Sequence, residues 1–476
     1  MPDLARLRDR LASVGQDHVL RFVDELDAAR RGALLAQIQS LDLAALPDLV
    51  ERFVKHPPAP ALPKDLRPAP YYPADAADAA RPWDASAARA RGEALIKSGK
   101  VAAFVVAGGQ GSRLGYDGPK GCFPAGAVTR KSLFQIFAEN LLWARDRYGV
   151  RVPWYIMTSP LNHEATTSFF EANKHFGLDA ADVRFFPQGV MPSLSISDGR
   201  MLLADKHEIA TNPDGHGGCI RALHVSGAIA DLIARGVEHL SYFQVDNPHV
   251  KVLDPLFLGL HAGAPDSSAE MSSKMVRKTD PAEKVGVFCL ADGRTEVIEY
   301  SDMPAALANQ RHANGSIAFD AGSIAIHIIG VSFLEKLATN PSFSLPFHRA
   351  EKKVPCVDLA TGEKVSPSTN NAVKLERFVF DALALAQKSI VVETDRVEEF
   401  APIKNASGVD SVESSARLQT ARAARWLEAC GVSVPRRADA SPDCVLEISP
   451  RTANGPEDLR HAKLPKVIEP GQVLAL

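Results

Sequence analysis

The sequence lacks the usual marks of a secreted, membrane-spanning or metal-stapled protein. Its 6 cysteines are scattered, and none forms a C-x-x-C pair or a zinc-spaced cluster with histidine, which favours a reducing compartment. No stretch approaches the roughly 18 apolar residues of a membrane span. The first residues carry charges every few positions and contain no apolar leader core. These absences predict a cytoplasmic protein without a membrane partner.

An excess of charge of either sign is also missing. The chain has 54 Lys and Arg against 57 Asp and Glu, a net charge of −3, so it lacks the basic surplus typical of non-specific nucleic-acid binding. No basic stripe interleaved with aromatic residues occurs, and no nucleic-acid partner is expected. Apolar residues make up 46% of the 476, enough for a full core without disulfides. This length predicts about three folding units.

The N-terminal part is predicted to be helical. Apolar residues follow helical spacing within residues 1–55. Residues 56–83 hold eight prolines and little periodicity, which is typical of a connector. A further helix is expected over Ala87–Ser98, with Ser86 as its N-cap. We therefore expect a first domain at residues 1–95, a helical region with a proline-rich linker.

From Lys100 onward, short apolar runs alternate with helical patterns. This alternation predicts a doubly wound α/β sheet in a second domain at residues 96–395. The expected strands are 101–107, 154–158, 183–186 and 239–245, and the expected helices are 132–144, 162–175, 218–235 and 371–385. The segments KMVRK, VGVFCL, TEVIEY and IAIHIIG add further strands. One helix at 416–430 and short strands predict a small β-rich C-terminal domain at residues 396–476.

The segment VVAGGQGSRLGYDGPKGCFPAG, residues 105–126, follows the first expected strand. Its glycines let backbone N–H groups approach a ligand closely, and Arg113 and Lys120 add two cations. A glycine-rich loop with cations at the carboxyl end of a parallel strand favours a phosphate or nucleotide site. The alternative is that the glycines only shape a tight turn. The spacing G-x-G-x-x-x-G is one residue too long for a dinucleotide fingerprint, and no GKS or GKT is present for a Walker A loop.

The motif AGGxGxRLGxxxPKG followed by RKSLFQI resembles the UDP-sugar pyrophosphorylases, and most closely those that use N-acetylglucosamine. The resemblance covers about residues 95–410 and continues in order through WYIMTS, FFPQG, PDGHGG, VDNPHVK, VGV, VIEYSD, FDAGSIAIH, NAVKLERFVFD and FAPIKNA. It implies a Rossmann-like nucleotidyltransferase (GT-A-like) mixed sheet. It also implies a reaction in which UTP and a sugar 1-phosphate give UDP-sugar and pyrophosphate. A monomer or homodimer is expected.

The resemblance assigns a role to each matching position. Arg113, Lys120, Lys374 and Lys404 would neutralise the phosphates as catalytic cations, and we expect the sheet to bring the two late lysines to one cleft. Lys404 would come from a C-terminal portion that closes over the site. The nucleotide would be held by Ala107, Gly108, Gly109, Gln188 and Gly215, of which Gln188 and Gly215 match uracil-binding positions. Asp246 ends a strand and matches the family's ligand for Mg²⁺, an ion that prefers oxygen ligands.

The sugar end departs from the family pattern. Glu299 matches a glutamate that accepts hydrogen bonds from sugar hydroxyls. His216, however, stands where the N-acetylglucosamine enzymes usually have Asn, and Asp320 and Ser323 stand where they read NAGN. The resemblance places the second of these asparagines, at Ser323, close to the sugar. His216 and Ser323 are thus two changed polar positions that can change the accepted sugar. N-acetylglucosamine 1-phosphate remains the first expectation, with His216, Glu299 and Ser323 as sugar-binding residues, and glucose or galactose 1-phosphate is second.

Two other classes of protein stay open at this point. A non-catalytic nucleotide-sugar binding protein would not need the complete set of phosphate cations. A dinucleotide-dependent oxidoreductase is disfavoured by the spacing of the glycines. Pyrophosphate release from UTP and a sugar phosphate distinguishes a uridylyltransferase from a non-catalytic binding protein. Titration with NADH tests the oxidoreductase hypothesis.

Overall fold

The computed structural model describes residues 4–58, 62–63, 65–340 and 343–476, which form two compact units. The first unit combines Met1–Leu62, Gln188–Cys219 and Ser344–Val379, and the second combines Pro63–Pro187, Ile220–Phe343 and Phe380–Leu476. These bounds differ from the domain boundaries expected at residues 95 and 395. The reason is that the N-terminal helices share a core with two later stretches of chain.

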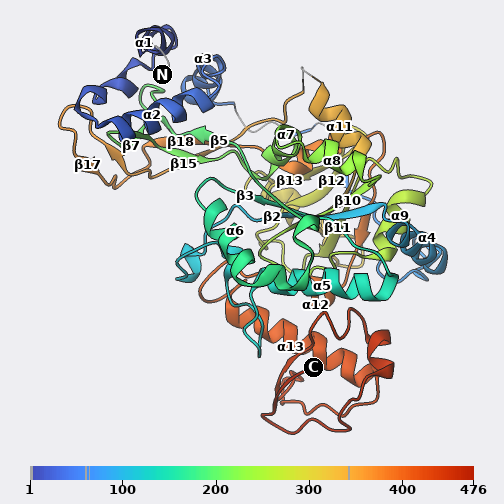
Figure 1. Ribbon diagram of the computed structural model, residues 1–476. Helices are drawn as coiled ribbons and strands as arrows, with labels where there is room; N and C mark the ends of the chain where they lie inside the picture. Colours follow the sequence, from blue (N-terminus) through green and yellow to red (C-terminus); the bar gives the residue numbers. More distant parts are fainter. Residues whose placement is uncertain (1–3, 59–61, 64, 341–342) are drawn as a thin grey trace. The chain divides into compact units, whose positions relative to one another are not determined.

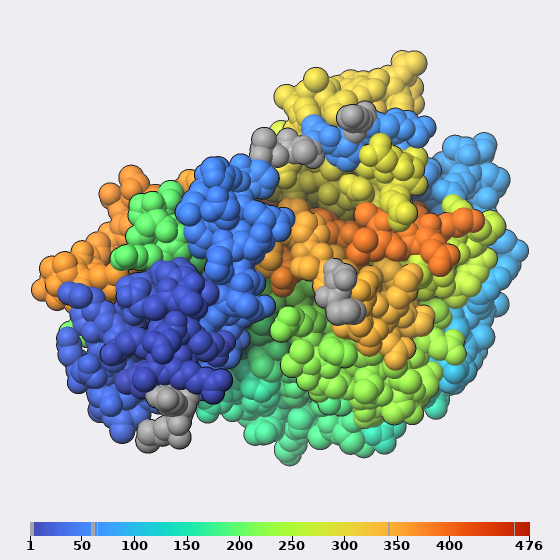
Figure 2. All heavy atoms as spheres, turned by 90° about the horizontal axis from the view of Figure 1, so that it is seen from above, coloured from blue at the N-terminus to red at the C-terminus, as the bar shows by residue number. Residues whose placement is uncertain are grey.

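The predicted N-terminal helices are present as α1 (Leu4–Ser13), α2 (Ala28–Ser40) and α3 (Leu46–Val50). Their buried leucines pack in one apolar cluster with strand residues from the two later stretches, among them Leu194 and Leu375. Figure 1 shows these helices beside β7 (Leu203–Asp205) and β18 (Ala372–Glu376), and Figure 2 shows the same blue helices gathered with green and orange segments. The apolar faces of these helices are therefore buried within this unit.

A three-stranded sheet in the first unit corrects one sequence prediction. Its order is β15 (His348–Lys352), β18 (Ala372–Glu376) and β6 (Leu194–Ser195), all antiparallel. The helix expected over residues 371–385 is wrong, because this range is β18 followed by a 3-10 helix over Val379–Leu385. Val373 and Leu375 are buried while Lys374 between them is half-buried. This alternation of period two suits a strand, and pairing with distant strands stabilises it.

The second unit contains the expected doubly wound sheet. Its parallel strands are β2 (Val101–Val106), β3 (Trp154–Thr158), β4 (Val183–Pro187) and β10 (His239–Gln244), each within one residue of the prediction. β14 (Ala321–Gly330) runs antiparallel to β10, which makes the sheet mixed. The remaining strands are β1 (Leu66–Pro68), β11 (Met271–Arg277), β12 (Val287–Ala291), β13 (Arg294–Ile298) and β19 (Val391–Glu393). The α/β fold class is confirmed.

Helices cover both faces of this sheet, with α4, α5 and α9 on one side and α8 and α11 on the other (Figure 1). α5 (Leu133–Tyr148) matches the start of the helix expected over 132–144. Its N-cap is Ser132, whose hydroxyl accepts a hydrogen bond from the Gln135 N–H at 3.1 Å. α4 (Ala85–Lys97) is capped by Asp84, so the predicted cap at Ser86 is wrong. α4 packs against α9 (Pro255–Gly263) through glycines: a Cβ at Gly259 would lie 1.8 Å from the Ala88 carbonyl oxygen.

Two predicted helices are interrupted where the backbone enters the left-handed region. The helix expected over 162–175 ends as α6 (His163–Ala172), and the following turn has positive φ at His175 and Phe176. The helix expected over 218–235 is split into α7 (Cys219–Val225) and α8 (Ala228–Ala234) at Gly227, where φ is 74°. A helix cannot continue through this conformation. The second unit also contains α10 (Ala305–Ala308), α11 (Val331–Thr339) and α12 (Arg396–Glu399).

The C-terminal residues have a small apolar core of their own. α13 (Val412–Ala429) covers all but the last residue of the helix predicted over 416–430, and it begins with a capping box between Ser411 and Ser414. The parallel strands β20 (Val445–Glu447) and β21 (Val473–Ala475) complete this region around Leu427 and Leu446. Among the described residues, no single helix is both long and apolar enough to cross a membrane, and only the bent pair His216–Val225 and Ala228–Ala234 passes that test of length and composition.

Two buried histidines, His239 at the start of β10 and His261 on α9, predict that acid lowers the stability of the fold. His261 is fully buried, its Nδ1 lies 2.8 Å from the Ser272 hydroxyl, and its ring centroid is 5.1 Å from that of His239. Burial, followed by the nearby charge of His239, lowers the pKa of His261 from 6.5 to about 3. As the pH falls, His261 therefore binds a proton in the unfolded chain before it does so in the folded chain. Its contribution to the free energy of unfolding is complete above pH 6.5 and is lost as the pH falls toward 3.

We expect the free energy of unfolding of His261→Asn to depend less steeply on pH in the acid range. The slope should decrease by up to about 1.4 kcal/mol per pH unit between pH 6 and pH 4, because one proton fewer is taken up on unfolding. Urea unfolding at a series of pH values measures this slope. The exposed His224→Asn is the matched control. An unchanged slope in His261→Asn would show that another group governs acid unfolding.

Candidate active site

The loop that follows β2 is fixed at both of its ends. The Ala107 N–H donates to the Met157 carbonyl at 2.7 Å, and the Asn162 amide donates to the carbonyls of Ala107 and Gly109 at 3.0 and 3.2 Å. The Lys120 N–H returns to the Gly109 carbonyl at 3.1 Å. These bonds hold the backbone of residues 107–109 and 120 at the carboxyl edge of the parallel strands, where ligands bind in α/β sheets.

Gly109 differs from Gly111, Gly115 and Gly121 of this loop, because neither packing nor backbone conformation requires a glycine at its position. A Cβ at Gly111 or Gly121 would collide with Tyr116 or Phe134, and Gly115 has a left-handed φ of 67°. A Cβ at Gly109 would meet nothing within 4 Å, and its φ is not positive. The missing side chain leaves open space beside an exposed backbone, which suits close approach of a ligand.

Lys120 and Asp246 form an ion pair at the end of the neighbouring strand β10. The Lys120 Nζ lies 3.7 Å from the Asp246 Oδ2, and the two side chains are only 15% and 14% exposed. Asp246 lines a cavity of about 60 Å³ together with Ser323 and Lys404. Three predicted site residues that are far apart in sequence therefore meet, and the fourth, Lys120, contacts one of them.

The segment that carries Lys404 is joined to the segment that carries Asp246. The Ile403 N–H donates to the Asp246 carbonyl at 2.8 Å, and the Ala401 N–H donates to the side-chain oxygen of Asn247 at 3.0 Å. The Lys404 Nζ lies 3.3 Å from the Asp410 Oδ2. Lys404 therefore has a carboxylate partner close by.

The two predicted sugar-binding residues of the second unit lie on either side of Gly286. The Ser323 N–H donates to the Gly286 carbonyl at 2.8 Å, and a Cβ at Gly286 would lie 3.2 Å from the Glu299 Oε1. Ala325, two residues beyond Ser323, lines the cavity of Asp246 and has a left-handed φ of 53°. A non-glycine residue in this conformation costs about 1 kcal/mol or more, and sequence analysis did not identify it.

Other predicted site residues belong to the first unit. Gly215 approaches the backbone of Arg377 so closely that a Cβ would lie 2.3 Å from its carbonyl oxygen, and its φ is 84°. The His216 Nδ1 accepts a hydrogen bond from the Val379 N–H at 3.1 Å, and its ring is stacked on Phe378 with a centroid distance of 5.0 Å. Burial, followed by the charge of His348, lowers the pKa of His216 to about 4, so its ring is neutral at pH 7.

The remaining predicted residues have simpler surroundings. Gln188 is buried immediately after β4, Lys374 is half-buried on β18, and Arg113 is exposed in a short 3-10 helix over Ser112–Leu114. Gln188, Gly215, His216 and Lys374 belong to the first unit, and the other predicted residues belong to the second. The expectation that Lys374 and Lys404 serve one cleft stays a prediction.

Asp246 fits a magnesium ion that arrives with its substrate. In the described part of the chain, no group of three or more His, Cys, Asp or Glu side chains could hold a metal ion. Mg²⁺ is commonly bound through one or two carboxylates together with substrate phosphates and water. A single carboxylate that lines a cavity beside two lysines therefore matches an ion that takes most of its ligands from outside the protein.

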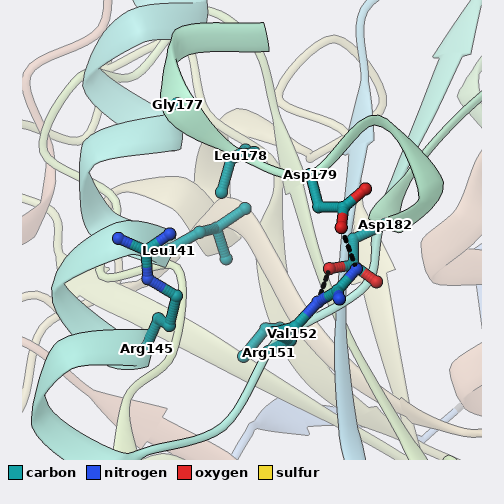
Figure 3. Close-up of a pocket in the computed structure, with 8 residues that line it drawn as sticks. All are labelled: Leu141, Arg145, Arg151, Val152, Gly177, Leu178, Asp179 and Asp182. Atoms are coloured by element: carbon teal, nitrogen blue, oxygen red, sulfur yellow. Dashed lines mark hydrogen bonds and ion pairs between the residues drawn. The ribbon is translucent and has the colours of Figure 1, made fainter.

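A larger pocket lies elsewhere in the second unit and carries none of the predicted residues. It has a volume of about 370 Å³ and is lined by residues of α5, the turn before β4 and Arg151 (Figure 3). Arg151 lies 2.7 Å from Asp179 and 2.5 Å from Asp182. Arg145, the second cation of this pocket, also has a carboxylate partner, with its Nε 3.2 Å from the Asp146 Oδ1.

The fold and the site together define a class of protein. A doubly wound sheet carries a glycine loop, a lysine and a carboxylate at the carboxyl edge of its parallel strands, as in α/β proteins that bind nucleotides. The lysines and the carboxylate suit phosphate transfer, in which positioning and charge neutralisation do most of the work.

The chain belongs to the UTP–glucose-1-phosphate uridylyltransferase family, which matches residues 80–425. It is 36% identical to the UDP-N-acetylhexosamine pyrophosphorylase-like protein 1 of Homo sapiens over 95% of this chain and 93% of that one. It is 35% identical to the UDP-N-acetylglucosamine pyrophosphorylase of Saccharomyces cerevisiae over 77% of each. The structure of the corresponding enzyme of Trypanosoma brucei superposes with a TM-score of 0.81 at 27% identity, covering 100% of this chain and 98% of that one. The expected enzyme class, a UTP:sugar-1-phosphate uridylyltransferase, is confirmed.

Proposed function

We propose that this enzyme transfers the uridylyl group of UTP to N-acetylglucosamine 1-phosphate and releases pyrophosphate. The observation that carries the proposal is the meeting of Asp246, Ser323 and Lys404 at one cavity, with Lys120 paired to Asp246. Further support for the sugar comes from the names of the relatives in Saccharomyces cerevisiae and Trypanosoma brucei.

In the proposed reaction, an oxygen of the sugar phosphate attacks the α-phosphorus of UTP. The bond from this phosphorus to the oxygen that bridges to the β-phosphate breaks, and the electron pair leaves with pyrophosphate. Lys120 and Lys404 neutralise charge on the phosphates, and the backbone at Gly109 lies against the nucleotide. Asp246 would hold Mg²⁺, which when bound neutralises phosphate charge. Lys374 and Arg113 are proposed as further phosphate-binding cations.

The sugar end of the site is proposed to involve Glu299, Ser323 and His216. Glu299 and Ser323 flank Gly286 in the second unit, and a carboxylate can accept hydrogen bonds from two sugar hydroxyls. His216 is proposed as a neutral ring, because its lowered pKa keeps it uncharged at pH 7. Gln188 and Gly215 are proposed to hold the uracil.

A panel of sugar 1-phosphates tests the proposed substrate. With UTP and Mg²⁺, pyrophosphate release should give N-acetylglucosamine 1-phosphate the highest kcat/KM, by about tenfold or more over glucose and galactose 1-phosphates, because the site pairs with the polar groups of its sugar. The same panel with Ser323→Asn, the residue expected from the family pattern, serves as a matched comparison. Equal rates for all three sugars, or a preference for glucose, would overturn the assignment of the sugar.

A further inference from the structure

A cluster of three buried charges lies beside the cavity of Asp246. Lys274 on β11 is 2% exposed and Glu399 at the end of α12 is 0% exposed. The Lys274 Nζ donates to both carboxylate oxygens of Glu399, at 2.6 and 2.5 Å, and to the Asp254 Oδ2 at 2.6 Å. One cation is thus shared by two carboxylates in the interior of the second unit.

The carboxylate of Asp254 and the ammonium group of Lys274 are both held in the charged state. Burial alone would raise the pKa of Asp254, but the charges of Lys274 and Lys251 outweigh it and lower that pKa to about 2. Burial would likewise lower the pKa of Lys274, and the two carboxylates raise it instead. Glu399 also accepts hydrogen bonds from the Thr394 hydroxyl at 2.9 Å and from the Lys251 N–H at 3.3 Å. Hydrogen bonds therefore compensate the buried charges of the cluster.

Stability alone does not explain such a cluster. Taking charges out of water is costly, and buried ion pairs can often be replaced by apolar side chains of similar volume without loss of stability. A buried charge cluster that fixes the geometry of its neighbours is better explained by what it positions.

The neighbours of Glu399 are the two chain segments that carry Asp246 and Lys404. The Asn247 side chain donates to the Glu399 carbonyl at 2.7 Å and accepts from the Ala401 N–H at 3.0 Å. Two residues further on, the Ile403 N–H donates to the Asp246 carbonyl at 2.8 Å. Lys404 follows directly. The side chain of Glu399 therefore anchors the start of the segment from Glu399 to Lys404, which leads to the cavity.

We propose that Glu399, held by Lys274, is a positioning residue that fixes Lys404 relative to Asp246. This inference rests on the proposed role of Lys404 in the uridylyl transfer. A small displacement of a charge at the reacting centre is enough to slow a reaction of this kind greatly. The effect of Glu399 on the reaction should therefore act through Lys404.

A double-mutant cycle with Glu399→Gln and Lys404→Ala tests the proposal on the full chain. Glu399→Gln keeps the shape of the side chain and should lower kcat by about 10- to 100-fold, with KM for UTP changed by less than about threefold. In the Lys404→Ala background it should cause almost no further loss, because the two residues act as a unit. Thr394→Val removes one hydrogen bond from Glu399 and should give the same pattern at smaller amplitude, which keeps the test open if Glu399→Gln unfolds.

Glu270→Gln is the matched control, because this mostly buried carboxylate pairs with Lys336 at 3.3 Å and lines no part of the cavity. It should leave kcat unchanged. If Lys404→Ala is impaired while Glu399→Gln and Thr394→Val are fully active, or if the losses multiply in the double variant, the positioning role is overturned and the role of Lys404 stands. If Lys404→Ala is fully active, the proposed role of Lys404 fails and the positioning role with it.

Discussion

Replacing Asp246 by alanine should lower kcat/KM for UTP by about 1,000-fold or more, the largest loss that we expect from one substitution. Among the described residues, Asp246 is the only carboxylate that lines the cavity with Ser323 and Lys404. Its removal takes away the proposed ligand of Mg²⁺ and also the partner of Lys120. Steady-state pyrophosphate release over a range of Mg²⁺ concentrations measures the effect, and excess Mg²⁺ should not restore the rate.

The control for this substitution is Asp146→Ala, a half-exposed carboxylate on α5 whose partners are surface arginines. It should retain full activity. The backbone carbonyl of Asp246 still accepts its bond from Ile403 in the variant, so the thermal midpoint should change little. An Asp246→Ala enzyme with half or more of the original activity would show that this carboxylate has no part in the reaction.

Replacing Lys120 by alanine should lower kcat by about 100- to 1,000-fold, the second largest loss. Its side chain is 15% exposed, its Nζ lies 3.7 Å from the Asp246 Oδ2, and its backbone N–H donates to the Gly109 carbonyl. In its proposed role this cation neutralises charge that grows on the leaving pyrophosphate, so we expect the loss to fall on kcat. Lys120→Arg keeps the charge and should recover part of the rate, because a planar fork is an imperfect substitute for a compact ammonium.

Lys100→Ala is the matched control for this second substitution, because Lys100 precedes the other end of β2 and pairs with Glu238 at 2.9 Å. It should be fully active. A Lys120→Ala enzyme whose KM rises while kcat is unchanged would contradict a role in the transition state and would assign Lys120 to ground-state binding.

The glycine loop and the ends of the parallel strands could be predicted from the sequence because their signals are local. A buried apolar run followed by glycines is read directly from residues 101–109, and β2 begins and ends within one residue of the prediction. The ending of a strand at Asp246 is a signal of the same kind. For these elements, composition and spacing over about ten residues are sufficient.

The supports of the site could not be predicted because they join residues that are far apart in the chain. Nothing near Lys274 in the sequence indicates that it binds Glu399, 125 residues later. The left-handed conformation of Ala325 has no local signal, since alanine rarely adopts it. β18 was misread as a helix because its partners β15 and β6 lie elsewhere in the chain.

The structure also explains one departure from the family pattern. Asp320 accepts a hydrogen bond from the Tyr71 hydroxyl at 3.3 Å and lies 4.0 Å from the Arg277 Nε. Burial raises the pKa of Asp320, and Arg277 opposes this shift. A carboxylate here has local partners of its own, so its presence does not by itself predict a different sugar. Ser323 and His216 remain the departures that bear on sugar choice.

Product analysis tests the central claim most directly. The protein is incubated with UTP, N-acetylglucosamine 1-phosphate and Mg²⁺, and the phosphorus-containing products are followed by ³¹P NMR. We predict that UDP-N-acetylglucosamine and pyrophosphate form in equal amounts, and that neither forms with Asp246→Ala or Lys120→Ala on the same timescale. Hydrolysis of UTP without a UDP-sugar, or no turnover of UTP at all, would contradict the assignment.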